Sequence, residues 1–142
     1  MTTLYEKDFC AWVSMQSRFL QNGELNKLDN DHLREELEQL GNGVESALES
    51  YLSNLLMHKL KILCQPIKHT RSWDLSIRNA SFHVQKLLRK NPSLKHGIDE
   101  TFSDAYYIAR LNAAKETKLA ESKFPKECPW TLDEILDTKQ GE

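Results

Sequence analysis

The chain has 142 residues, of which 39% are hydrophobic and 28% are charged, and its formal net charge is −2. These values exclude a disordered or collagen-like chain and are typical of one helix-rich globular domain over residues 1–142. The first residues carry charges where a signal peptide needs an apolar run, and the apolar stretch 55–64 is interrupted by one histidine and two lysines. We therefore expect a cytoplasmic protein without a membrane segment.

The first predicted helix spans residues 5–23. Thr3 and Glu6 have the spacing of a capping box, and Asn22-Gly23 supplies the left-handed residue that often ends a helix. Seven side chains recur at helical spacing, so we expect them to form an inner face. They are Tyr5, Phe9, Trp12, Val13, Gln16, Phe19 and Leu20.

The central helix is predicted over residues 30–64 and has the longest continuous helical pattern in the chain. Asp29 or Asp31 is expected to cap it, because acidic side chains are favoured at a helix N-terminus. Gly41-Asn42-Gly43 interrupts the pattern without shifting its phase, so we predict one helix with a bend near Gly41-Gly43. Its apolar face comprises Leu33, Leu37, Leu40, Val44, Leu48, Tyr51, Leu52, Leu55, Leu56, Leu60 and Leu63.

Two further helices are predicted beyond Pro66. Ser72 is expected to cap a helix over residues 73–90, and Ser93 a helix over residues 94–115. The inner stripe of the first comprises Trp73, Ile77, Ala80, Val84, Leu87 and Leu88, and that of the second comprises Leu94, Ile98, Phe102, Ala105, Ala109, Asn112 and Ala113.

The remaining segment, 118–142, is predicted to be a docked tail. Its proline-rich part cannot be helical, but Thr131 and Glu134 have capping-box spacing and predict a short last helix. No segment shows the alternation of a strand. The predicted fold is therefore all-α: a four-helix bundle with a long central helix and a C-terminal strap that carries a short helix.

The charges form an acidic, a basic and a second acidic segment. Residues 1–56 contain four Lys or Arg and ten Asp or Glu, residues 57–98 contain nine and one, and residues 99–142 contain six and ten. The candidate binding residues are basic side chains of the middle segment together with one tryptophan: Arg71, Trp73, Arg78, Lys86 and Arg89. They could contact a nucleic-acid backbone, since guanidinium groups bind phosphates, or pair with acidic side chains internally or in an oligomer.

A second candidate site combines carboxylates with a histidine. Glu36, Glu38 and His58, together with Arg78, are the candidate catalytic residues, and His32 and Glu36 have the i, i+4 spacing of a weak metal-binding pair. On a straight helix Glu36 and His58 would be roughly 33 Å apart, so they could meet only through the bend or with residues of other helices. The alternative is that both carboxylates pair with Lys or Arg and that His58 is a structural, neutral histidine.

Cys10, Cys64 and Cys128 are odd in number and far apart in the sequence, so we expect reduced thiols. A reactive Cys128 beside Trp130 is conceivable, because nearby lysines stabilise a thiolate. The alternative is that Trp130 and Phe124 only attach the tail to the bundle.

Several short motifs, taken in order, resemble the bacterial domain of unknown function 29 family, and the resemblance covers the chain from Tyr5 to Asp137. The motifs are Glu35-Glu36-Leu37-Glu38 with Leu40-Gly41, Leu55-Leu56-Met57-His58, Arg71-Ser72-Trp73 with Ile77-Arg78, Pro92-Ser93-Leu94, Phe124-Pro125, and Cys128-Pro129-Trp130-Thr131-Leu132. The resemblance implies a small, all-helical, cytoplasmic bacterial protein. It implies no activity.

The sequence leaves three functions open. The first is a non-enzymatic module that associates with itself or with an acidic protein partner. The second is a nucleic-acid-binding protein that uses the basic segment 57–98, and the third is an enzyme or metal-binding protein that uses Glu36, Glu38 and His58. We expect no cofactor and no membrane partner.

Overall fold

The computed structural model describes residues 3–136, and these residues form helices and loops without a strand. The all-α class is therefore confirmed, with four main helices, a long α3 and a short C-terminal helix. The chain divides into two compact units, residues 1–43 and 44–142, which are described separately. The expectation of a single domain stays a prediction. None of the described helices is both long enough and apolar enough to cross a membrane.

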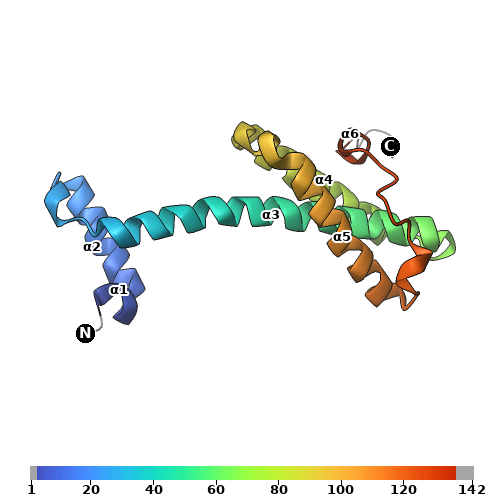
Figure 1. Ribbon diagram of the computed structural model, residues 1–142, viewed down its shortest axis with the longest axis horizontal. Coiled ribbons are helices and arrows are strands. Elements are labelled where there is room, and N and C mark those ends of the chain that lie inside the picture. Colours follow the sequence, from blue (N-terminus) through green and yellow to red (C-terminus); the bar gives the residue numbers. More distant parts are fainter. Residues whose placement is uncertain (1–2, 137–142) are drawn as a thin grey trace. The chain divides into compact units, whose positions relative to one another are not determined.

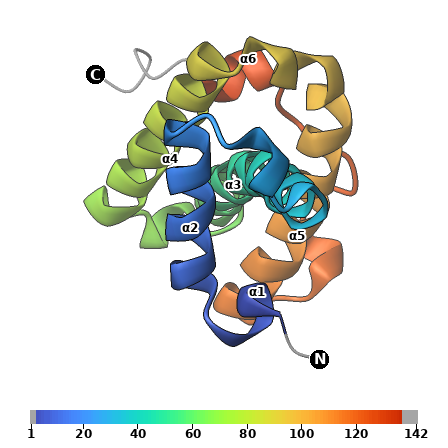
Figure 2. The same ribbon diagram turned by 90° about the vertical axis from the view of Figure 1, so that its left-hand side faces the viewer.

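The N-terminal unit contains α1 (Leu4–Lys7), α2 (Phe9–Gln21), the 3₁₀ turn η1 (Leu25–Lys27) and the beginning of α3 (Asn30–Cys64). Figure 2 shows α1 and α2 from the side of this unit. Only Trp12 and Gln16 are buried in α2, and both bond to Asp29, the residue just before α3. The packing of α2 is thus centred on the N-terminus of α3.

The first predicted helix, 5–23, is two helices in the structure. Thr3 caps α1 as expected, but Asp8 leaves the helical conformation with φ −151° and accepts a hydrogen bond from the backbone N–H of Ala11. Aspartate stabilises a helix more as an N-cap than in its interior, which explains the break. The inner face is also narrower than predicted, because Phe9, Val13 and Leu20 are exposed.

The helix α3 begins and ends as predicted and is continuous through Gly41 and Gly43. The boundary between the two units falls directly after Gly43. The apolar face of α3 is buried at the positions that belong to the C-terminal core, whereas Leu37, Leu40 and Leu63 are exposed. A helical period identifies the apolar face but not the stretch of it that neighbouring helices cover.

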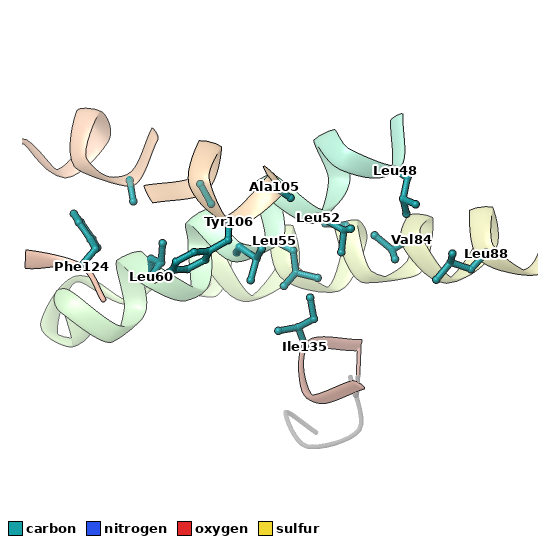
Figure 3. Close-up of a cluster of buried hydrophobic side chains, with 14 residues drawn as sticks. Leu48, Leu52, Leu55, Leu60, Val84, Leu88, Ala105, Tyr106, Phe124 and Ile135 are labelled. Carbon is teal, nitrogen blue, oxygen red and sulfur yellow. The ribbon is translucent and has the colours of Figure 1, made fainter. Parts of the chain in front are cut away.

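The C-terminal unit is built around the second half of α3. The helices α4 (Arg71–Lys90) and α5 (Ile98–Thr117) pack against it (Figure 1), and α6 (Leu132–Leu136) closes the same core. Figure 3 shows how the side chains meet. The buried apolar side chains are Leu48, Leu52, Leu55, Leu56, Leu60, Ala80, Val84, Leu88, Ala105, Tyr106, Ala109, Ala113, Phe124 and Ile135.

Two predicted helix starts are wrong. Thr70, not Ser72, caps α4, and its hydroxyl accepts a bond from the backbone N–H of Trp73. Ser93 does not cap a helix but belongs to the 3₁₀ helix η3 (Pro92–Gly97). Both η3 and the shorter 3₁₀ helix η2 (Pro66–Lys68) begin with a proline. Proline fits the first position of a helix because it lacks the N–H that would stay unpaired there, and α5 then begins only at Ile98.

The tail contacts the core through several side chains. Phe124 follows the short helix η4 (Glu121–Lys123) and is 2% exposed, and Ile135 of α6 is 3% exposed. Thr131 accepts a bond from the N–H of Glu134, as the capping box predicts. The carbonyl of Leu136 accepts a 2.8 Å bond from the amide of Gln85 in α4. Residues 137–142, also part of the predicted tail, lie outside the described residues.

Candidate functional site

The outer face of α4 carries a row of basic and apolar side chains. Along the helix, the row comprises Arg71, Leu75, Arg78, Phe82, Lys86 and Arg89, which we call the α4 outer face. Successive members are three or four residues apart, so they share one side of the helix, opposite the buried Ala80, Val84 and Leu88. The row extends over roughly 27 Å at 1.5 Å per residue.

Two of these side chains are large and apolar, yet they are exposed. Leu75 is 46% exposed and Phe82 is 57% exposed. Together with Arg78 they line a surface hollow of about 420 Å³. An apolar side chain that stays exposed does not gain the free energy of burial. Exposed apolar side chains that cluster between charged ones therefore often mark an interaction surface.

The basic side chains of this face form no ion pairs with other described residues. The ion pairs that involve the segment 57–98 are Lys61–Glu116, at 3.8 Å, and His69–Asp74, at 2.6 Å. Arg71, Arg78, Lys86 and Arg89 have no carboxylate within ion-pair distance in the part of the chain that the structure describes. Among residues 3–136, the internal pairing that the sequence left open thus does not involve this face.

Trp73 is predicted to be both a core residue and a binding residue, and its burial tests the first of these predictions. It is half-buried, and the Nζ of Lys61 lies 4.6 Å from the centre of its ring. The ring of His69 stacks on the ring of Trp73, with 6.4 Å between their centroids. Such cation–π contacts stabilise a partly buried ring without removing it from solvent. The prediction that Trp73 is a core residue is therefore wrong, because Trp73 is not a member of the buried cluster. Its role in binding stays a prediction.

The N-terminal unit contains a second polar constellation, which we call the His32 cluster: Tyr5, Trp12, Asp29, His32 and Glu36. The Nδ1 of His32 lies 2.7 Å from Oδ2 of Asp29, and Trp12 donates its Nε1–H to the same oxygen at 3.0 Å. The ring of Tyr5 stacks on that of His32 at 4.0 Å, and its hydroxyl donates to Glu36. The cluster therefore joins α1 and α2 to the first two turns of α3.

The hydrogen bonds in this cluster shift the pKa values of its side chains. The hydrogen bond from His32 lowers the pKa of Asp29, and the same bond raises the pKa of His32. The hydrogen bond to Glu36 is the main cause that raises the pKa of Tyr5 to about 12, so this hydroxyl keeps its proton. The weak metal pair His32 and Glu36 is thus occupied by internal bonds, and the described residues contain no group of three metal-binding side chains.

The stability of the N-terminal unit should depend on pH through His32. Because the folded pKa of His32 is raised, its contribution is fully present below the unfolded pKa of about 6.5 and is lost as pH rises through the folded pKa. His32→Gln should remove this part of the pH dependence of the free energy of unfolding. His96→Gln, at an exposed histidine of η3, is the control and should keep it. Identical pH profiles for the parent and His32→Gln would contradict the role of the pair.

The candidate catalytic residues are distributed over both units. Glu36 accepts from Tyr5, and Glu38 is exposed and accepts a bond from Nε of Arg34 at 3.2 Å. His58 belongs to the C-terminal unit, where burial and then the charge of Lys61 lower its pKa, and its buried Nδ1 has no partner among residues 3–136. This environment favours a neutral imidazole, as expected of a structural histidine. A site shared by Glu36, Glu38 and His58 stays a prediction.

The cysteines are reduced, as expected. Cys10 is exposed, whereas Cys64 and Cys128 are partly buried against the core. Burial is the main cause that raises the pKa of both partly buried thiols, so the lysines near Cys128 do not produce a thiolate there. Trp130 is partly buried, with the Nζ of Lys59 5.1 Å from its ring centre.

Comparison with known proteins gives one family. The family model described as "Domain of unknown function DUF29" matches residues 4–140. No curated protein and no solved structure matches the chain.

Proposed function

The chain belongs to the DUF29 family, a domain of unknown function, so the family gives no activity to transfer. From the geometry of the site, we propose that the protein is a non-enzymatic protein-interaction module whose α4 outer face binds an acidic partner. The observation that carries the proposal is the pair Leu75 and Phe82, exposed within a row of arginines that have no carboxylate partner in the described chain.

The mixture of side chains favours a protein partner. A nucleic-acid backbone is contacted chiefly by cations, and its affinity comes from charge neutralisation. Leu75 and Phe82 contribute to binding only when a partner shields them from water. Burial against apolar side chains of a protein does this, and it is favourable by about 1.5 to 3 kcal/mol for each fully buried side chain. Arg78 lies between them in the row and can pair with a carboxylate of the partner.

The spacing of the row indicates the shape of the partner. Leu75 and Phe82 are seven residues apart, which is two helical turns, and arginines lie beyond them on both sides. An amphipathic helix with apolar residues at the same interval and flanking carboxylates is complementary to this pattern. We therefore expect the partner to present such a helix.

The partner can be captured directly from the α4 outer face. A photoreactive benzoylphenylalanine at position 82, introduced into the full chain in cells, should crosslink to a protein through an acidic amphipathic segment. The control is the same group at Ile67, which is 99% exposed but lies in η2. Identical products from the two positions, or nucleic acid as the main product at position 82, would contradict the proposal.

Point variants separate the contributions to binding. Binding can be measured with the captured segment as a synthetic peptide. Phe82→Ser should raise the dissociation constant by about 10- to 100-fold, because an apolar contact is lost. Arg78→Gln should raise the dissociation constant about fivefold and reduce its salt dependence. Arg34→Gln, which alters an exposed arginine of α3, is the matched control and should leave affinity unchanged. Equal affinities for parent and Phe82→Ser would show that the face is not the binding site.

A further inference from the structure

A second surface, independent of the α4 outer face, has the features of a ligand site. A hollow of about 650 Å³ lies between the end of α3, α5 and residues 122–126, and we call it the strap pocket. This volume is in the range of about 300 to 1,000 Å³ that is common for small-molecule sites. Its lining combines three cationic side chains, Arg110, Lys123 and Lys126, with apolar side chains that include Leu63 and Phe124.

Arg110 gives the strap pocket a fixed positive charge. Its side chain is 14% exposed, and one terminal nitrogen donates to the carbonyl oxygens of Glu121 and Phe124 at 3.1 and 3.3 Å. The guanidinium is therefore held in place before any ligand arrives, which reduces the entropy lost on binding. The Nε of Arg110 is buried without a hydrogen-bond partner among the described residues, which is uncommon in a folded protein.

The charge balance around the strap pocket is positive. The carboxylate of Glu121 lies 3.6 Å from Nη1 of Arg110, but its side chain is half exposed, and it does not line the hollow. The lining itself contains three cations and no carboxylate. The thiol of Cys64, which also lines the pocket, adds no competing negative charge, because burial raises its pKa.

The apolar part of the lining distinguishes this site from a simple cluster of surface lysines. Leu63 is 51% exposed, although it belongs to the same helix face as the fully buried Leu60. Phe124 also belongs to the lining, and its ring is buried in the core (Figure 3). A ligand that fits both parts needs an anionic group for the cations and a ring or short hydrocarbon for the apolar wall.

We propose that the strap pocket binds a small organic anion, a phosphate or carboxylate attached to an apolar group. Lys123 and Lys126 contact the anionic group, Arg110 holds the loop that carries them, and Leu63 and Pro125 contact the apolar group. Phosphate and carboxylate share the charge that the cations recognise, so the experiment includes both.

Cys64 makes the strap pocket testable in the unmodified chain. Alkylation of Cys64 and of Cys10 by N-ethylmaleimide can be followed separately by peptide mass spectrometry, and Cys10 serves as the internal control because it is exposed in the other unit. Phenyl phosphate or benzoate should slow alkylation of Cys64 and leave that of Cys10 unchanged. Phenol, which lacks the negative charge, and inorganic phosphate, which lacks the ring, should protect less.

A charge variant tests the assignment of the cations. Lys123→Gln/Lys126→Gln should weaken protection by the better of the two anions about tenfold, since each exposed charge contributes modestly. Lys95→Gln/Lys115→Gln, which removes two lysines outside the pocket lining, should behave like the parent. Equal protection by phenol and phenyl phosphate, unchanged protection in Lys123→Gln/Lys126→Gln, or no protection by either anion would overturn the proposal.

Discussion

Replacing Phe124 with alanine should lower the free energy of unfolding by about 3 to 5 kcal/mol, the range for removing a buried aromatic side chain. Phe124 is 2% exposed and lies in one core with Leu60 and Tyr106 (Figure 3). The hydroxyl of Tyr106 donates to the carbonyl oxygen of Pro125 at 2.5 Å, so the loss of the ring also weakens a neighbouring bond. Chemical denaturation followed by circular dichroism measures the change.

The chain supplies a matched control for this substitution. Phe82→Ala removes the same atoms from an exposed position and should change the free energy of unfolding by no more than about 0.5 kcal/mol. A loss in Phe124→Ala as small as that in Phe82→Ala would mean that Phe124 does not contribute to the core. Amide hydrogen exchange should also become faster in residues 121–136 of Phe124→Ala, because their attachment depends on this ring.

Replacing Trp12 with alanine should cost about 3 to 5 kcal/mol in the N-terminal unit. Trp12 is 4% exposed, its indole donates to Asp29, and its ring makes edge contacts with Tyr5 at 4.8 Å. Its removal creates a cavity and leaves a carboxylate with one bond fewer. Amide hydrogen exchange over α2 and the first turns of α3 measures the loss.

Two further variants locate the cause of the loss at Trp12. Trp12→Phe keeps an aromatic ring but cannot donate to Asp29, so it should cost less, about 1 to 2 kcal/mol. Phe9→Ala removes a ring that is 46% exposed and should cost less than Trp12→Ala. A Trp12→Ala variant with unchanged exchange in α2 would contradict the assignment of Trp12 as the centre of this unit.

The sequence predicts the helices well where an apolar stripe is long. The bounds of α3 and the buried series from Leu48 to Leu60 follow from helical spacing, because a buried face must repeat with the helix period. The break at Asp8 and the 3₁₀ helix at Pro92 were not predicted. Both depend on competition between a local cap or turn and a continued helix, and the apolar period does not resolve this competition.

The candidate sites are only partly predictable. The basic members of the α4 outer face follow from sequence, but Leu75 and Phe82 were not recognised as exposed members of the same row. The His32 cluster was missed because its contacts join residues 17 and 31 positions apart, such as Trp12 with Asp29 and Tyr5 with Glu36. Asp29 was predicted only as a cap, although Asp29 and His32 at a helix start are a recognisable pair.

The division of α4 into two faces has a consequence for how family members diverge. Val84 and Leu88 are constrained by packing, whereas exposed side chains of the outer face contribute little to folding. Substitutions at Arg78 or Phe82 should therefore leave the protein folded, and under the proposed function their main effect is on binding of the partner. One helical scaffold can in this way acquire different binding specificities while its core stays the same.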